Sequence, residues 1–293
     1  MKKMNLAKKM LIVAIMAMLY QGIKAQVTTT YAMDSPSFVL MSQDVSKYET
    51  IDQSYLNLVY HFKTKSSAND TEMQFEDDMV LLIGKKFTSF FSKNLHELDA
   101  KRDSIIQLYG MAISEQGWQG YEIKTDLKKK ELTVDNRIPF TKDVCRYKEP
   151  APQMKWSIEN SSDSVFGYKC QKATTEYCGR KYLVWFTSDI PISTGPWKFA
   201  GLPGIILKVT DTEHNFSFEC IELTQRPIPI VNYTWKYKNM SKTEWLKFEK
   251  NMYEHAGRFI AGTGARVIIM DDSEKGSHPI SKQLSLFYNP MER

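Results

Sequence analysis

The sequence of 293 residues lacks the short motifs that identify several enzyme classes. It has no G-x-S-x-G nucleophile elbow, which argues against an α/β-hydrolase, and no Walker A or dinucleotide-binding fingerprint. His96-Glu97 begins like a zincin motif, but position 100 is Ala, so the second zinc ligand is missing. We therefore predict no catalytic residue, no metal ligand and no cofactor, and we favour a binding protein over an enzyme.

Acidic residues are missing from the first 25 positions, and this asymmetry accounts for the whole positive charge of the chain. The sequence has 39 Lys and Arg against 34 Asp and Glu, a net charge of +5. Five of those lysines lie within 1–25, so positions 26–293 hold 34 basic and 34 acidic residues. A formally neutral chain makes nucleic acid a poor partner and gives no support to electrostatic membrane binding.

The first 25 residues have the pattern of a secretory signal peptide. Lys2, Lys3, Lys8 and Lys9 form a basic start, and Met10 to Tyr20 is an uncharged apolar run. That run has 11 residues, fewer than the roughly 20 that a bilayer crossing needs. Cleavage after Ala25 would leave residues 26–293, which we predict to be one β-rich domain that is exported and does not span the membrane. An uncleaved anchor or a buried helix is the alternative.

Cysteines are few: Cys145, Cys170, Cys178 and Cys220. An exported chain meets an oxidising compartment, so disulfides are permitted, and four cysteines allow three pairings. Free, buried thiols are the alternative, because a chain of this length can build a core without disulfides. Cys170 and Cys178 are eight positions apart, which does not fit the spacing of a zinc ribbon.

Strand patterns dominate the chain, with apolar residues alternating or in short runs bounded by turn residues. Strands are predicted at 54–63, 79–83, 87–91, 131–138, from 156, 165–177, 182–187, 205–209 and 216–220. In the 165–177 strand, Phe166, Tyr168 and Cys170 are expected on one face. Glu149 to Pro152 is interpreted as a bend between two halves of one sheet. Short connections such as Cys178 to Lys181 indicate antiparallel pairing.

Two segments are predicted to be helices. From Leu95 to Tyr109 apolar residues recur at helical spacing, and Gly110 supplies a C-terminal stop. Ser241 and Glu244 form a capping box, which predicts the start of a helix. Gly257 follows the last turn of this helix. The predicted fold class is α+β, mainly β: a curved antiparallel sheet, up to a half-barrel, with two flanking helices.

Runs of like charge are interpreted as solvated segments. Glu76-Asp77-Asp78 and Asp271-Asp272 could bind Ca²⁺, but no EF-hand loop surrounds them, so solvated turns are favoured. Lys128-Lys129-Lys130 is likewise predicted to be a solvated loop.

Residues 193–207 are unusual because three glycines and two prolines fall between Gly195 and Gly204. Glycine permits positive φ and close backbone approach, and proline fixes φ, so the loop should be rigid. It is either a binding loop or a tight sheet corner, and the corner is favoured. The candidate binding residues are Gly195, Pro196, Trp197, Phe199, Gly201, Leu202, Pro203 and Gly204, together with Trp185 and Arg180.

This loop resembles the name motif of the GLPGLI family of exported Bacteroidetes proteins. The hexapeptide here is Gly201-Leu202-Pro203-Gly204-Ile205-Ile206, with Ile in place of the fifth-position Leu. Gly167 to Ala173, Gly179-Arg180, Trp185 to Thr187, Ile190 to Ile192 and Gly195 to Phe199 resemble the family's preceding segments. The resemblance covers about 156–223, implies a place in a Gram-negative envelope (periplasmic, outer-membrane-associated or secreted), and supplies no agreed catalytic residue or substrate.

Three functions are compatible with these patterns. The first is non-enzymatic binding of an apolar ligand or an outer-membrane partner, suggested by export and by the aromatic sheet beside Trp197. The second is an envelope hydrolase acting on peptide or glycan, which requires Asp189, Arg180 and His214 to converge in one cleft. The third is a structural or assembly role, in which an exposed sheet edge pairs with a strand of a partner.

Overall fold

The computed structural model describes residues 12–14, 26–30, 41–68, 71–109, 119–263, 267–270, 277–279, 282–283, 285–286 and 288–292. The side chains of 12–14, 26–30, 66–68, 71–73, 102–109, 267–270 and 277–279 are not described. Most of the predicted signal peptide, Gly110 and Asp271-Asp272 lie outside the described residues.

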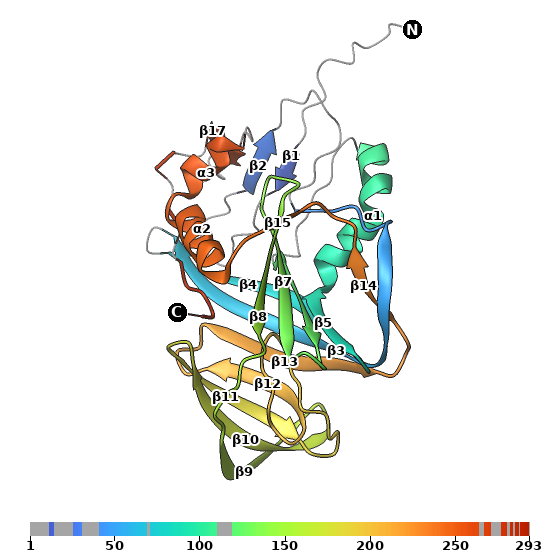
Figure 1. Ribbon diagram of the computed structural model, residues 1–293. Coiled ribbons are helices and arrows are strands. Elements are labelled where there is room, and N and C mark those ends of the chain that lie inside the picture. Colours follow the sequence, from blue (N-terminus) through green and yellow to red (C-terminus); the bar gives the residue numbers. More distant parts are fainter. Residues whose placement is uncertain are drawn as a thin grey trace, which may run out of the picture.

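The described chain is mainly β, with strands that follow one another through most of its length (Figure 1). The strands are β1 (Ile12–Ala14), β2 (Gln26–Thr30), β3 (Tyr48–Ala68), β4 (Thr71–Gly84), β5 (Phe87–Ser92), β6 (Tyr121–Asp126), β7 (Glu131–Arg137), β8 (Val144–Pro150), β9 (Ser157–Val165), β10 (Tyr168–Tyr177), β11 (Arg180–Thr187), β12 (Ile205–Asp211), β13 (Phe216–Thr224), β14 (Pro229–Tyr233), β15 (Tyr237–Asn239), β16 (Val267–Met270) and β17 (Ser277–Pro279). The helices are α1 (Lys93–Tyr109), α2 (Lys242–Glu254) and α3 (Ala256–Gly262).

One sheet of 13 strands contains most of these elements, in the order β15-β8-β7-β6-β5-β4-β3-β13-β12-β11-β10-β9, with β14 also paired to β3. Its pairs are antiparallel except for β15 with β8, which is parallel. The strands β1, β2, β16 and β17 form a separate sheet of four. The predicted fold class, mainly β with a curved antiparallel sheet, is confirmed.

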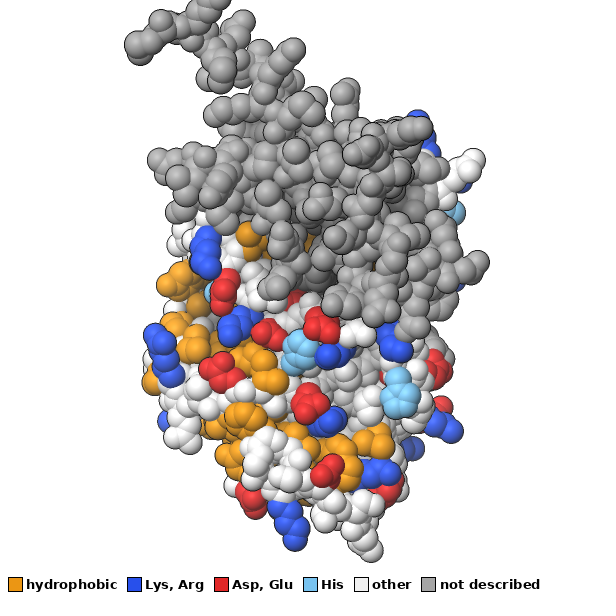
Figure 2. All heavy atoms as spheres, turned by 180° about the vertical axis from the view of Figure 1, so that it is seen from behind, with side chains coloured by type: hydrophobic (Ala, Val, Ile, Leu, Met, Phe, Trp, Pro, Cys, Tyr) orange, Lys and Arg blue, Asp and Glu red, His pale blue; other side chains and the backbone are white. Residues whose placement is uncertain are grey.

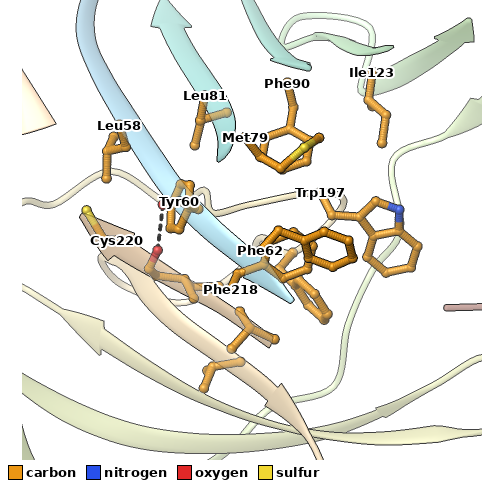
Figure 3. Packing of buried hydrophobic residues seen from close by; sticks show 14 of the residues in the cluster. Leu58, Tyr60, Phe62, Met79, Leu81, Phe90, Ile123, Trp197, Phe218 and Cys220 are labelled. Carbon is orange, nitrogen blue, oxygen red and sulfur yellow. Dashed lines mark hydrogen bonds between the residues drawn. The ribbon is translucent and has the colours of Figure 1, made fainter. Parts of the chain in front are cut away.

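The sheet curves so far that its distant strands enclose a single core. β8 and β9 follow each other in the chain but lie near opposite ends of the sheet, joined by residues 151–156. The Thr175 hydroxyl on β10 donates to the carbonyl oxygen of Lys155 in this connection. As a result of this curvature, one core cluster combines residues from β6 and β7 with residues from β10 to β13. Figure 3 shows Phe62, Phe90, Phe218 and Trp197 packed within this one core cluster.

Two tight hairpin turns connect the last strands of the sheet: one joins β10 to β11, and the other joins β9 to β10. Cys178 and Gly179 have φ of 48° and 75°, the pair of positive values that a tight two-residue hairpin uses, and this turn was predicted. Phe166 and Gly167 have φ of 50° and 78° and form the same kind of turn between β9 and β10. The prediction that Phe166 shares a strand face with Tyr168 and Cys170 is therefore wrong.

The helices agree with the sequence patterns at their starts more than at their ends. The Ser241–Glu244 capping box is present at the start of α2, and Trp245 is buried beneath it. His255 has φ −126° and ψ 38°, which interrupts the helix, and α3 then begins at Ala256. Gly257 lies buried inside α3, so its predicted role as a helix stop is wrong and a third helix is added.

Asp77 corrects the interpretation of Glu76-Asp77-Asp78 as a solvated turn. The three residues lie within β4, and Asp77 is buried. Its carboxylate accepts hydrogen bonds from Ser92 Oγ and Asn94 Nδ2, each at 3.1 Å, and from the Gln119 backbone N–H at 3.2 Å. Burial raises the pKa of Asp77 to about 6 against the opposing effect of these hydrogen bonds.

All four cysteines are free thiols in the structure. Cys145, Cys170 and Cys220 are buried in strands, and Cys178 lies at the β10–β11 turn. Burial raises the pKa of the Cys220 thiol to about 12, so this sulfur is unreactive at neutral pH.

On the face of the molecule seen from behind, the described residues carry both charges without separating them. Figure 2 shows acidic and basic side chains interspersed with apolar ones on the described part of the face seen from behind. Lys128, Lys129 and Lys130 are exposed at the β6–β7 turn, which confirms the predicted solvated loop. Among the described residues, no helix has the length and apolar character that a bilayer crossing requires.

Candidate functional site at the mouth of the curved sheet

The 188–204 loop between β11 and β12 folds back inside the curved sheet instead of projecting into solvent. Trp197 is 9% exposed, and Phe199 and Leu202 are 1% exposed. The Trp197 ring meets Tyr177 of β10 edge-on at 5.9 Å, and Phe199 meets Tyr182 of β11 at 4.8 Å. These aromatic side chains therefore belong to the core, although the loop that carries them is irregular.

The three glycines of the loop are required for two reasons: close backbone approach at Gly195 and Gly204, and a positive φ at Gly201. A Cβ on Gly204 would lie 2.0 Å from the Thr187 carbonyl oxygen, and one on Gly195 would lie 2.7 Å from Ile206 Cβ. Gly201 has φ of +100°, and its backbone passes beside the Trp156 indole. Trp156 Nε1–H donates to the Ala200 carbonyl oxygen at 2.9 Å. The motif is thus a tight sheet corner, as favoured from the sequence, and a binding role for its residues stays a prediction.

Lys198 lies in this corner, and its side chain forms part of a cluster of charged residues. Its ammonium is buried and lies 2.5 Å from both Glu149 Oε1 and Glu292 Oε1. Lys242 of α2 completes the arrangement, since its Nζ lies 2.7 Å from Glu149 Oε2 and 2.5 Å from Glu292 Oε2. Two ammonium groups and two carboxylates therefore form a closed ring in which each cation bridges both anions.

The pKa values of the ring follow from this pairing. Burial opposes ionisation of Glu292, but Lys198 and Lys242 outweigh it and lower the pKa of Glu292. Burial likewise opposes the charge on Lys242, and its hydrogen bonds to the two carboxylates outweigh that effect and raise its pKa. Both pKa shifts favour the charged forms of Glu292 and Lys242.

Arg180 holds the same segment that supplies Glu292. Its guanidinium pairs with Asp211 at 3.1 Å and Glu213 at 3.3 Å. Arg180 Nε–H also donates to the Pro290 carbonyl oxygen at 2.9 Å, and its Nη2 group donates to Asn289 Oδ1. Beside it, the Tyr182 hydroxyl donates to the Met291 carbonyl oxygen at 2.7 Å. We call the site made by Arg180, Tyr182, Lys198, Glu149 and Lys242 the mouth.

The segment from Tyr288 to Glu292 occupies the mouth in an irregular conformation outside any strand or helix. An open groove of about 550 Å³ runs between this segment and α2. The groove is lined from α2 by Thr243, Leu246, Lys247 and Lys250, and from the segment by Tyr288, Asn289, Pro290 and Glu292. Trp197 does not line this groove.

Glu249 of α2 anchors the other end of the segment. Its carboxylate accepts a hydrogen bond from the Tyr288 hydroxyl at 2.9 Å. Burial raises the pKa of Glu249 to about 7, and the nearby Glu292 carboxylate adds to that effect. The segment is therefore held at two carboxylates. Glu292 has a lowered pKa and is charged at neutral pH, whereas Glu249 titrates near pH 7.

The structure brings some of the sequence-predicted residues together and separates others. Arg180, Trp197 and Phe199 lie at or beside the mouth, whereas Trp185 is on the opposite face of β11 from the buried Tyr182, Val184 and Phe186. His214 lies in the turn near Arg180, but Asp189 follows the far end of β11, about 23 Å away at the usual rise of a strand. The proposed convergence of Asp189, Arg180 and His214 is therefore wrong.

The charged ring itself was missed from the sequence. Lysines and glutamates are seldom buried unless they are paired, so Lys198, Glu149, Lys242 and Glu292 read individually as surface residues. Their pairing joins positions between 49 and 94 residues apart in the chain, a separation with no periodic signal. Lys198 was the one available clue, because it lies inside the rigid Gly-Pro loop.

Comparisons with known proteins cover the corner of the site more closely than the whole chain. The family described as "Protein of unknown function (Porph_ging)" matches residues 179–208, which hold β11, the glycine-rich loop and the start of β12. No curated protein sequence matches the chain.

Two solved structures are similar to part of the chain. A structure titled "Structure of PNGF-II in P21 space group" has a TM-score of 0.47 and 11% identity over 67% of this chain and 32% of its own. The same protein in the C2 space group has a TM-score of 0.44 and 12% identity over 65% of this chain and 32% of its own. The chain thus spans about a third of the length of those structures, and similarity of this size supports no inference about function.

Proposed function

We propose that the chain is an exported, non-enzymatic protein of the GLPGLI family that binds a protein partner of the cell envelope at the mouth. The family proposal is supported by the match of residues 179–208 to a family of unknown function, because those residues contain the Gly201–Ile206 motif. Export is supported by the basic and apolar pattern of residues 1–25.

The observation that carries the binding role is the incomplete charge balance of the mouth. Lys198 and Lys242 bring two positive charges from the body of the protein, and Glu149 brings one negative charge. The second negative charge comes from Glu292, on a segment that makes contact through side chains and carbonyl oxygens. The corner and the curved sheet thus build a polar receptor site for a segment that is remote in the sequence.

An apolar ligand is less favoured than a protein partner, because the concave face is filled by its own side chains. Tyr60, Phe62, Phe186 and Phe218 are each at most 2% exposed, and Phe62 stacks on Phe218 at 4.5 Å. The Tyr60 hydroxyl within this core donates to the Ile206 carbonyl oxygen at 2.7 Å. A lipid would have to displace packed aromatic rings at a cost of several kcal/mol.

Site-specific photo-cross-linking in the native cell tests the proposed function. A photoreactive amino acid replaces Lys247, which lines the groove beside the mouth, or Lys169, which is also exposed and lies on β10. We expect one discrete cross-linked protein from position 247 and none from position 169, in the envelope fraction. The same products from both positions, or none from position 247, would count against a partner at the mouth.

A further inference from the structure

We propose that the mouth recognises a short acidic peptide segment of its partner, and that residues 288–292 are a built-in occupant that the partner displaces. This inference rests on the proposed function and adds the chemistry of the partner to it. It follows from how the segment is held, from the charge it completes and from the groove beside it.

Two of the contacts to the segment are made to its main chain, and a third is made to a side chain. Arg180 Nε–H and the Tyr182 hydroxyl donate to the carbonyl oxygens of Pro290 and Met291, at 2.9 and 2.7 Å. Any peptide presents carbonyl oxygens at these intervals, so this part of the recognition does not depend on the side chains of the occupant. The two contacts fix the position of the main chain of the occupant across the mouth, at a bend centred on Met291.

The third contact is selective, because it requires a carboxylate. Glu292 accepts from both Lys198 and Lys242, and the Tyr177 hydroxyl also donates to it at 3.3 Å. Without Glu292, Glu149 would be the one carboxylate among the described residues within ion-pair distance of the two ammonium groups, of which that of Lys198 is buried. A buried charge without a partner is strongly unfavourable, so an occupant must supply an acidic group at this place.

The surroundings of the mouth favour an acidic partner as well. Lys247 and Lys250 of α2 line the groove that runs beside the segment, close to Lys242 on the same helix. The groove is open, with a volume of about 550 Å³, so a second peptide can approach the segment along its length. Residues 288–292 are in no strand, and displacing them therefore breaks no sheet ladder.

The test uses the full-length protein and two labelled peptides. One peptide has the sequence of residues 286–293 (Leu-Phe-Tyr-Asn-Pro-Met-Glu-Arg), and the other has Gln in place of its Glu. Fluorescence anisotropy measures binding to the wild type, to Glu292→Gln, and to Glu49→Gln as a matched change at an exposed residue of β3 that belongs neither to the mouth nor to the groove. Circular dichroism checks that each variant is folded.

We expect the Glu peptide to bind Glu292→Gln at least about tenfold more tightly than it binds the wild type or Glu49→Gln, because the variant's own segment no longer satisfies the ring. On Glu292→Gln, the Gln peptide should bind at least about tenfold more weakly than the Glu peptide. Equal affinities for the two peptides, or no binding of either, would overturn the inference.

A second form keeps the test decisive if Glu292→Gln does not fold. A protease site introduced at the turn of Lys282 and Gln283 allows the segment to be cut after folding and exchanged for labelled peptide. The same preference for Glu over Gln is expected, and its absence again refutes the inference. Cross-linking at position 247 with no preference between the peptides refutes the acidic-segment inference alone. A peptide preference without cross-linking refutes the proposed envelope partner instead.

Discussion

Gly204→Ala is the substitution that most sharply separates a structural corner from a binding loop. The added Cβ would lie 2.0 Å from the Thr187 carbonyl oxygen, 2.6 Å from its carbon and 3.0 Å from Ser188 Cα. All three are backbone atoms at the end of β11, and Thr187 pairs directly with Ile205 at the start of β12. The overlap can be relieved only by separating two paired strands, since no flexible side chain can move aside.

The expected cost follows from this geometry. Overpacking a core costs about 1–3 kcal/mol when side chains can adjust, and here the backbone must move, so we expect a loss of at least about 3 kcal/mol. For a chain of this size that corresponds to a fall in Tm of about 6–12 °C. Urea denaturation and thermal unfolding, each followed by circular dichroism, measure the two quantities.

Two other glycines serve as matched controls. Gly167 has φ of +78° with no atom within 4 Å of a built Cβ, so Gly167→Ala should cost about 1–2 kcal/mol from backbone strain alone. Gly262, in α3, also has open space, and Gly262→Ala should be neutral or stabilising by up to about 1 kcal/mol. A Gly204→Ala protein within about 1 kcal/mol of the wild type would refute the corner and return the motif to a direct binding role.

Three further predictions concern buried polar groups. Asp77→Asn should remove a pH dependence: the raised pKa of Asp77 stabilises the fold below about pH 4 and that contribution is lost as pH rises through about 6, so urea titrations should show the wild type losing up to about 3 kcal/mol relative to the variant between pH 4 and pH 7. Glu249→Gln should act in the same direction over pH 4.5 to 8, because the pKa of Glu249 is raised to about 7, and parallel stability profiles for variant and wild type would contradict this. The groups facing Glu249 are Tyr288, Glu292, Lys198, Tyr121, Tyr147 and Tyr253. Trp156→Phe should cost about 1 kcal/mol in chemical denaturation through loss of the hydrogen bond to the Ala200 carbonyl, and an unchanged midpoint would show that this bond is not needed to hold the corner.

Features with a local physical cause could be predicted from the sequence. The turn at Cys178-Gly179 follows from the positive φ that glycine tolerates, and the start of α2 follows from the hydroxyl and carboxylate of its capping box. The glycine-rich corner also belongs to this class, because close backbone approach requires glycine wherever it occurs in a chain. These predictions needed only neighbouring residues.

Features that depend on distant partners could not be predicted in the same way. Asp77 reads as solvated between two other acids, and only its contacts with Ser92, Asn94 and Gln119 explain its burial. The order of the sheet is equally non-local, since β8 and β9 are neighbours in sequence but lie near its opposite ends. The mouth could not be predicted for the same two reasons: its charged residues are hidden by their pairing, and its lysines and acidic occupant come from separate parts of the chain.

A double-mutant cycle between Lys198 and Glu292 tests most directly that the mouth holds an acidic segment. The unfolding free energies of the wild type, Lys198→Met, Glu292→Gln and the double variant give the coupling between the two side chains. The 2.5 Å contact in a buried site predicts a coupling of at least about 1.5 kcal/mol, so the double variant should lose less stability than the sum of the losses in the two single variants. A coupling below about 0.5 kcal/mol would contradict the account, because Glu292 would then not be seated on Lys198.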